Sequence, residues 1–219
     1  MKILNESQDI SMVEIVPAKI TNILKTKIPK EGVEDINKYI DKIFSNRSSL
    51  TGGQISLDFE NKHLKPIASF VLDLSEKYCE RFYKDCNMPL SKLSFSIHNM
   101  WSTHQCEGEY NPIHTHDTNT ESGLSCFLYL KVPESIKSSS KLSRTTSFRG
   151  KGGMFDGNTD LLFGHSTAPP AKSFKFPGHM SVIPEEGIVY LFPKWIPHLA
   201  YPFYGPGERR TLGININIF

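Results

Sequence analysis

The end of the sequence alternates apolar and polar residues with a period of two. Between residues 211 and 219, leucine and isoleucine occupy the even positions up to 218, and threonine, glycine and asparagine occupy the odd positions up to 217. Successive side chains of a β-strand point to opposite faces, so this pattern predicts a strand with one apolar and one polar face. The chain therefore ends in a sheet whose two faces differ.

Other strand-like segments are short and are separated by glycine, proline and asparagine. They lie at residues 12–16, 93–97, 125–132, 160–163 and 188–193. Short strands without regularly interspersed helices favour a closed or double-sheet β architecture over a βαβ fold. We therefore expect a mainly β protein.

The first third of the sequence has a different period. Apolar residues recur at helical spacing over residues 34–44 and, more regularly, over residues 65–83, which predicts two amphipathic helices. A polar segment ending in Gly-Gly at residues 48–53 predicts a turn between them.

Length favours a single domain over residues 1–219, since domains commonly have about 150 residues. We expect residues 1–90 to form a helix-rich N-terminal part and residues 91–219 to form the β core. Residues 134–180 are rich in serine, lysine, glycine and proline, and we interpret them as an insertion between strands.

Charge and cysteine content exclude several classes of protein. The 25 Lys and Arg residues nearly balance the 23 Asp and Glu residues, leaving a net charge of +2, so nucleic-acid binding is not indicated. The 4 cysteines include no Cys-x-x-Cys pair, which argues against a zinc ribbon or a thioredoxin-like motif. Apolar runs stay well short of the roughly 18 residues of a membrane helix, and the first residues lack the pattern of a secretory signal. We expect a cytoplasmic protein without a membrane partner.

Three histidines occur where they could bind one metal ion. His114 and His116 lie two residues apart, so on a strand both imidazoles point to the same face and can form a chelate. His198 follows an apolar strand and a proline-bounded turn, and it is the best candidate for a third ligand. Asp117 has the wrong parity for a regular strand. Histidine pairs at this spacing are also common as exposed residues, so the pair alone is a weak signal.

Arg209 and Thr211 share strand parity and could together bind a carboxylate. The guanidinium would form two parallel hydrogen bonds, and the hydroxyl would add a third. The alternative is that Arg209 and Arg210 are surface charges beside a glycine- and proline-containing turn.

Four motifs in a fixed order resemble those of the iron(II)/2-oxoglutarate-dependent oxygenases. More narrowly, they resemble the prolyl-hydroxylase-like members found in marine bacteria and their phages. The motifs are Asn-Pro-x-His-x-His at 111–116, Ser-Gly-Leu-Ser-x-Phe-Leu-Tyr-Leu-Lys-Val-Pro at 122–133, Leu-Phe-Pro-x-x-x-x-His at 191–198 and Pro-Phe-x-Gly-x-Gly-Glu-Arg-Arg-Thr at 202–211. The resemblance extends from residue 95 to the C-terminus.

The resemblance implies a double-stranded β-helix, or jelly-roll, fold that binds Fe(II) and uses 2-oxoglutarate as cosubstrate. His114 matches the first histidine of the family's His-x-Asp…His triad, and His198 matches the last. The carboxylate position falls on His116, a departure from the general pattern.

The resemblance also implies a cosubstrate site. Arg209 matches the residue that binds the distal carboxylate of 2-oxoglutarate, Thr211 matches the hydroxyl of the family's Arg-x-Ser, and Tyr129 is a further candidate contact. Trp101 and Phe127 are candidates for the wall of the substrate pocket, although aromatic residues of this kind are more often ordinary core residues.

The implied activity is that of a hydroxylase. It would couple oxidative decarboxylation of 2-oxoglutarate to hydroxylation of a C–H bond, with dioxygen and an unknown substrate, such as a prolyl or other peptidyl side chain. Such an enzyme would work in the cytoplasm of a bacterial or phage-infected cell. Two alternatives stay open: a catalytically silent jelly-roll binding module, and a cupin-like metalloenzyme without 2-oxoglutarate, for which Glu121 would be a candidate ligand. No motif indicates an oligomeric state.

Overall fold

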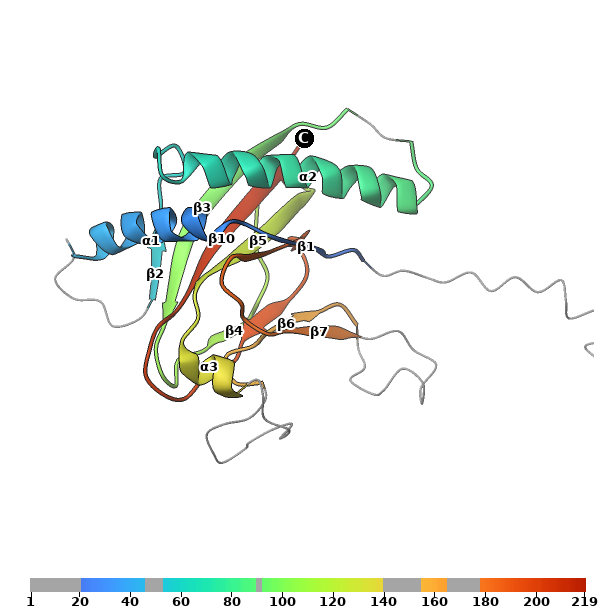
Figure 1. Cartoon of the computed structure of the whole chain (residues 1–219). Coiled ribbons are helices and arrows are strands. Elements are labelled where there is room, and N and C mark those ends of the chain that lie inside the picture. The colour runs from blue at the N-terminus through green and yellow to red at the C-terminus, as the bar shows by residue number, and fades with distance from the viewer. Residues whose placement is uncertain (1–20, 46–52, 90–91, 140–154, 165–177) are drawn as a thin grey trace, which may run out of the picture.

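Two antiparallel sheets and two long helices make up most of the structure (Figure 1). The computed structural model describes residues 21–45, 53–89, 92–139, 155–164 and 178–219. Within these ranges, no helix is long and apolar enough to cross a membrane.

The larger sheet has six strands and the smaller has four, and every pairing between neighbouring strands is antiparallel. In spatial order, the larger sheet contains β1 (Leu24–Lys27), β8 (Ile188–Pro193), β5 (Gly123–Lys131), β10 (Arg209–Ile218), β3 (Phe95–Gln105) and β2 (Gly53–Ser56). The smaller sheet contains β4 (Asn111–His114), β9 (His198–Ala200), β6 (Thr159–Leu162) and β7 (His179–Val182). This mainly β, two-sheet architecture confirms the predicted jelly roll.

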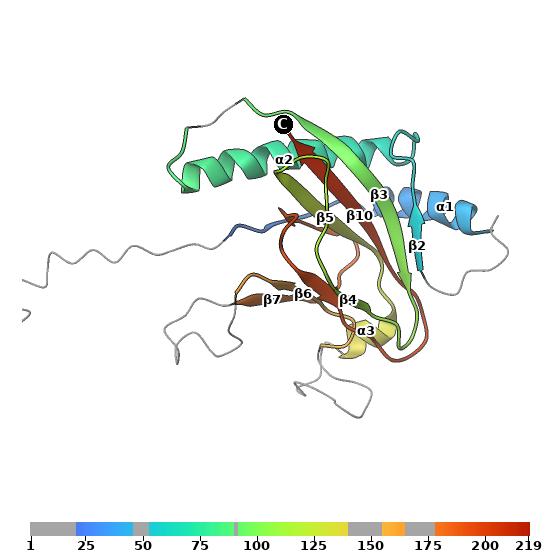
Figure 2. The same ribbon diagram turned by 180° about the vertical axis from the view of Figure 1, so that it is seen from behind.

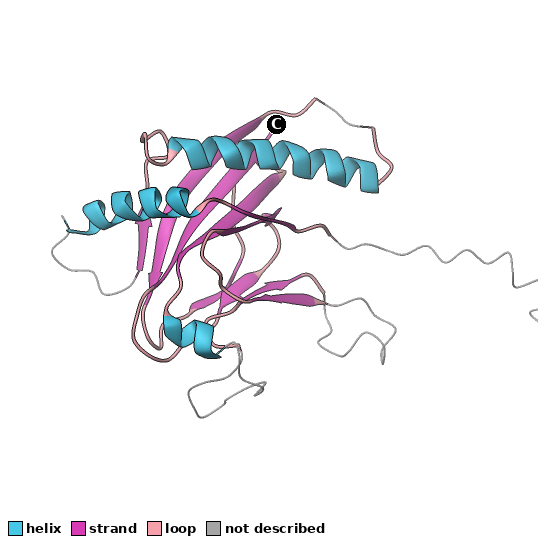
Figure 3. Cartoon of the chain, viewed as in Figure 1, coloured by secondary structure: helices cyan, strands magenta, loops and turns pink. Residues whose placement is uncertain are grey.

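Both long helices cover one face of the larger sheet, as Figures 2 and 3 show. α1 (Lys30–Ser45) and α2 (Lys65–Asp85) contain the predicted helical segments and extend beyond them. Pro66 lies in the first turn of α2, where its missing N–H leaves no helical hydrogen bond unmade. A third, short helix, α3 (Glu134–Ser139), follows β5.

The alternation of β10 separates two cores. Its even residues Leu212, Ile214 and Ile216 are fully buried in the cluster between the sheet and the long helices. A second cluster, which includes Phe127, Tyr129 and Leu161, lies on the other face, between the two sheets. The polar odd-numbered residues of β10 face the space between the sheets. Polar side chains can therefore line a site there, within an otherwise apolar core.

Residues 134–180, which we interpret as an insertion, also contain part of the smaller sheet. This stretch supplies β6 and the first two residues of β7, His179 and Met180, and β6 lies in the smaller sheet between β9 and β7. Strand β6 nearly coincides with the strand that the sequence indicates at residues 160–163, whereas no pattern in the sequence indicates β7. Similarly, the helix-rich N-terminal part contributes β1 and β2 to the larger sheet. The strand predicted at residues 12–16 and most of the turn predicted at 48–53 lie outside the described residues.

Candidate active site

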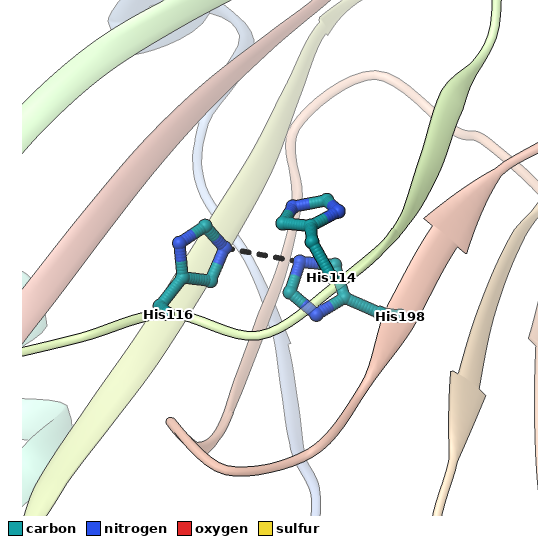
Figure 4. Close-up of side chains that lie close together, drawn as sticks. All are labelled: His114, His116 and His198. Carbon is teal, nitrogen blue, oxygen red and sulfur yellow. Dashed lines mark hydrogen bonds between the residues drawn. The ribbon is translucent and has the colours of Figure 1, made fainter.

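Three imidazoles meet between the smaller and larger sheets (Figure 4). His114 ends β4 and His198 begins β9, and the two are partners in the antiparallel register; His116 follows two residues after β4. The ligand nitrogens of the three rings lie within 4.8 Å of one another. The structure therefore brings together the three histidines that the sequence suggested.

Backbone carbonyls orient two of the rings. His114 Nδ1 donates to the carbonyl oxygen of Pro112 (2.6 Å), and His198 Nδ1 donates to that of Ile196 (3.1 Å). A carbonyl oxygen can only accept, so in both neutral rings Nδ1 carries the proton and Nε2 keeps its lone pair. This arrangement is typical of metal-binding histidines, whose second nitrogen is held by a hydrogen bond.

Two of the three imidazoles are held in the neutral form that binds metal. Burial, reinforced by the neighbouring imidazoles, lowers the pKa of His116 to about 3 and that of His198 to about 4. The Nε2 atoms of these two rings lie 3.0 Å apart, close enough to share a proton that a metal ion would replace. Imidazole nitrogens suit first-row transition metals such as iron, so the cluster fits a divalent iron ion.

Neither nearby carboxylate joins the cluster. The Asp117 side chain is 99% exposed and lies 3.7 Å from Lys194 Nζ. Glu121 is exposed as well, outside the group of potential ligands. Among the described residues, therefore, the third potential ligand of the cluster is His116 and not one of these two carboxylates.

Arg209 is buried in the same cavity and is not a surface charge. It is 3% exposed, and its Nη1 and Nη2 donate to Gln105 Oε1 (2.5 Å) and Thr159 Oγ1 (2.5 Å), both neutral acceptors. Its Nε is buried without a hydrogen-bond partner, and no described carboxylate forms an ion pair with it. A buried cation without a counter-ion is costly, so this guanidinium is suited to bind an anion.

The cavity is enclosed by both sheets. Its polar and aromatic lining residues are Trp101, Thr103, Gln105, Asn111, His114, His116, Ser125, Phe127, Thr159, His198, Arg209 and Thr211. The predicted site residues thus share one cavity, with one exception. Tyr129 is fully buried beneath Arg209, whose guanidinium lies 5.4 Å from its ring centroid, and it is not part of the lining.

Gly213 leaves space for the side chain of Trp101, which forms part of the cavity wall. Gly213 faces Trp101 across the β10–β3 register, and a Cβ atom at this glycine would lie 2.3 Å from the indole. The indole in turn lies 5.1 Å, centroid to centroid, from the His116 ring. Gly213 therefore lets Trp101 lie across β10 and support the imidazole of His116.

Sequence reasoning missed Gln105 and Thr159, the two hydrogen-bond partners of Arg209. Gln105 ends β3, and Thr159 begins β6 in the stretch that was expected to be an insertion. Neither belongs to a motif, and only the pairing of distant strands brings them to Arg209. Thr103 had a signal in the sequence, because it has the same parity as Trp101 on β3, and it faces Thr211 across the register. Asn111 and Ser125, which also line the cavity, lie within two of the quoted motifs.

Comparisons with known proteins agree with this geometry. Residues 99–215, just over half of the chain, match the model of a family described as "Putative 2OG-Fe(II) oxygenase". No curated protein matches the sequence.

Similar solved structures include HygX from Streptomyces hygroscopicus with nickel and 2-oxoglutarate bound (11% identity, 90% of this chain and 83% of that chain covered, TM-score 0.56). A prolyl-4-hydroxylase from Pseudomonas putida is 11% identical, with 90% of this chain and 92% of that chain covered and a TM-score of 0.53. A viral collagen prolyl hydroxylase from Paramecium bursaria Chlorella virus-1 has 15% identity, coverage of 89% and 94%, and a TM-score of 0.52. Identities this low show a common fold, and together with the family match they lead to one conclusion: the chain belongs to the 2-oxoglutarate- and Fe(II)-dependent oxygenase family.

Proposed function

We propose that this protein is a dioxygenase that hydroxylates a C–H bond of its substrate and consumes 2-oxoglutarate. The observation that carries the proposal is a single cavity that contains three imidazoles close enough to hold one metal ion and a buried guanidinium without a carboxylate partner among the described residues. When bound, Fe(II) and 2-oxoglutarate supply the oxidising chemistry, in which dioxygen is reduced, the cosubstrate loses carbon dioxide to become succinate, and the substrate gains a hydroxyl group.

The protein contributes binding and orientation. His114, His116 and His198 would hold the iron through Nε2, since backbone carbonyls already direct Nδ1 of two of these rings. Arg209 would pair with the far carboxylate of 2-oxoglutarate, and the Thr211 hydroxyl lies on the same face of β10 to add a hydrogen bond. Three ligands on a metal that binds six leave positions for the cosubstrate and dioxygen.

We further propose a prolyl or other peptidyl side chain as substrate. Two of the structurally similar proteins are prolyl hydroxylases. The apolar part of the cavity, formed by Trp101 and Phe127, would contact an uncharged ring or alkyl group better than a charged one.

The experiment that tests the function is an anaerobic titration of the protein with Fe(II) and then 2-oxoglutarate. We expect a visible metal-to-ligand charge-transfer band at one equivalent of each, and succinate once air is admitted. His198→Ala should lose the band. His63→Ala is the matched control, because His63 pairs with Asp35 outside the described cavity and should leave the band intact.

A second candidate is a binding module that retains the cavity but not the catalysis. The observation that favours it is His116 at the carboxylate position, since a centre of three neutral imidazoles carries one negative charge fewer. A charge-transfer band without succinate formation, in the presence of peptidyl-proline substrates or without them, would support this candidate. The exposed position of Glu121 argues against a cupin-like centre that uses this glutamate.

A further inference from the structure

His116 is the one imidazole of the cluster that does not lie on a strand. His114 ends β4 and His198 begins β9, whereas His116 lies two residues beyond β4, in the segment that leads to β5 (Figure 4). The pairing of β4 with β9 fixes the first two residues relative to each other. The position of His116 in the cluster therefore depends on what holds this segment, which we call the 116–123 loop.

Lys194 is attached to both ends of the 116–123 loop through its backbone. It lies between β8 and β9, in the turn that leads to His198. Its carbonyl oxygen accepts a hydrogen bond from the N–H of His116 (3.2 Å), and its own N–H donates to the carbonyl oxygen of Gly123 (3.1 Å). One residue thus connects the turn before His198 with the loop that carries His116.

The ammonium group of Lys194 adds two hydrogen bonds to the middle of the same loop. Nζ donates to Thr118 Oγ1 (2.9 Å) and to the carbonyl oxygen of Thr120 (2.7 Å). The side chain of Lys194 is only 16% exposed and Thr118 is buried, so water competes little for these bonds. Asp117 lies 3.7 Å from Nζ, but its carboxylate is exposed and contributes little as an ion pair. The side chain therefore acts mainly through its hydrogen bonds to the loop.

We propose that Lys194 is a positioning residue that holds His116 at the distance from the other two imidazoles that one metal ion requires. A protonated amine has no lone pair, so Lys194 acts through the 116–123 loop and not as a ligand. The inference rests on the proposed function, in which these imidazoles bind a metal ion. Without the ammonium group the loop would adopt more conformations, and only a fraction of them would be competent to bind the ion, which lowers the apparent affinity.

The test measures Co(II) binding to the full-length protein by visible absorption, without 2-oxoglutarate. The d–d bands of Co(II) report the number and geometry of its ligands, and imidazole sites bind Co(II) more tightly than Fe(II). Lys194→Met removes the ammonium group and keeps the apolar part of the side chain. We expect Co(II) affinity to fall by about 10-fold, the lower end of the range for residues that orient a ligand, with altered d–d bands. Urea unfolding of the metal-free protein measures any loss of stability separately.

Lys131→Met is the matched control. Lys131 is also a partly buried lysine, but its Nζ contacts Asp41 (3.2 Å) and Glu208 (3.4 Å), and it does not line the cavity. This variant should alter only the free energy of unfolding and keep Co(II) affinity within about 2-fold, because separate sites act independently. If Lys194→Met gave this same result, its role would be merely structural and the inference would be overturned.

A double-mutant cycle determines whether Lys194 acts through His116. In a His116→Ala background, Lys194→Met should change Co(II) affinity by less than about 2-fold, because the ring that the loop positions is absent. In a His114→Ala background, the loss of about 10-fold should persist. Equal losses in the two backgrounds would contradict the inference.

Two further variants keep the test decisive if Lys194→Met fails to fold. Thr118→Val keeps the size of the side chain but removes one acceptor of the ammonium group, and it should weaken Co(II) binding by at least about 3-fold. Lys194→Arg should keep most of the affinity, because a guanidinium can donate to the same two oxygens. Unchanged Co(II) affinity in Thr118→Val would refute the positioning role. By contrast, a wild-type protein that binds no Co(II) would contradict the proposed function itself.

Discussion

Two adjacent arginines, Arg209 and Arg210, point to opposite faces of β10 and have very different partners. Arg210, on the helix face, is 2% exposed and bonds to both Glu208 oxygens (2.9 and 3.1 Å) and to Asp41 Oδ1 (2.7 Å). Arg209, on the cavity face, is 3% exposed, and its acceptors among the described residues are neutral. Both positions bury a charge, but within the part of the chain that the structure describes only the helix face supplies carboxylates to compensate it.

The difference separates an arginine with a structural role, Arg210, from Arg209, which we propose binds a ligand. Arg210 also bonds to Asn37 and lies over the Phe44 ring, so it ties α1 to the start of β10. Its charge is satisfied within the folded chain. Arg209 has no carboxylate partner among the described residues and shares its cavity with the three imidazoles, which supports our proposal that it binds the anionic cosubstrate. The cavity face should therefore respond to mutation through ligand binding, and the helix face through stability.

The largest effect should come from the imidazole cluster. His198→Ala removes one of three ligands, and we expect Fe(II) affinity to fall by more than about 100-fold, since even loss of a group that only orients a ligand costs about 10- to 100-fold. Metal content after dialysis, together with thermal unfolding of the metal-free protein, checks this. Stoichiometric iron in the variant would refute the ligand assignment.

Exchanging each arginine for methionine tests the comparison directly. Arg209→Met should reduce 2-oxoglutarate affinity by about 100-fold, because a buried charge pair would lose its cation. Arg210→Met should leave that affinity within about 3-fold but lower the free energy of unfolding by about 3 kcal/mol, because Glu208 and Asp41 lose their partner. Calorimetric titration and urea unfolding of both variants provide the measurements. The interpretation fails if the two variants show the same pair of effects.

Acid should lower the free energy of unfolding through the contacts of Glu208, on the side of β10 that faces α1. Burial raises the pKa of Glu208, but hydrogen bonds from His104 and Arg210 outweigh it and lower the value from 4.5 to about 2. A depressed carboxyl pKa contributes stability that is fully present above pH about 4.5 and is lost as the pH falls toward 2, at most about 3 kcal/mol in total. His104 adds to this loss of stability once the pH falls below the ordinary pKa of histidine, because burial lowers the pKa of His104 in the folded protein. Urea unfolding from pH 7 to 3 should show a smaller acid loss for Glu208→Gln than for the wild type.

The smallest effect should come from Gly213→Ala. The added methyl group would collide with the Trp101 indole, which lies across β10 and contacts His116. We expect a loss of about 1–3 kcal/mol in stability, as is usual for overpacking. A shift in tryptophan fluorescence and a modest loss of iron affinity should accompany it. Unchanged fluorescence would mean that the indole is not held by this glycine. Arg210→Met, which acts on the opposite face, should leave the indole signal unchanged.

Much of this organisation could be predicted from local sequence. The period of two in β10 assigns Arg209 and Thr211 to one face and the isoleucines to the other, because backbone geometry alone sets which way alternate side chains point. The rule does not account for His116, which lies two residues beyond the end of β4 and reaches His114 and His198 from the loop that follows the strand. The two long helices follow from the 3.6-residue period, since their apolar face must be buried.

Only the tertiary structure determined the surroundings of these residues. Thr159 and Gln105 reach Arg209 because β6 and β3 take particular places in two different sheets, and Tyr129 lies beneath the guanidinium rather than in the cavity. Local periodicity shows which face of a strand is buried, but not which distant strand packs against that face. Strand order and register depend on the packing of the whole core, so the charge balance that distinguishes Arg209 from Arg210 arises only when both sheets and α1 are in place.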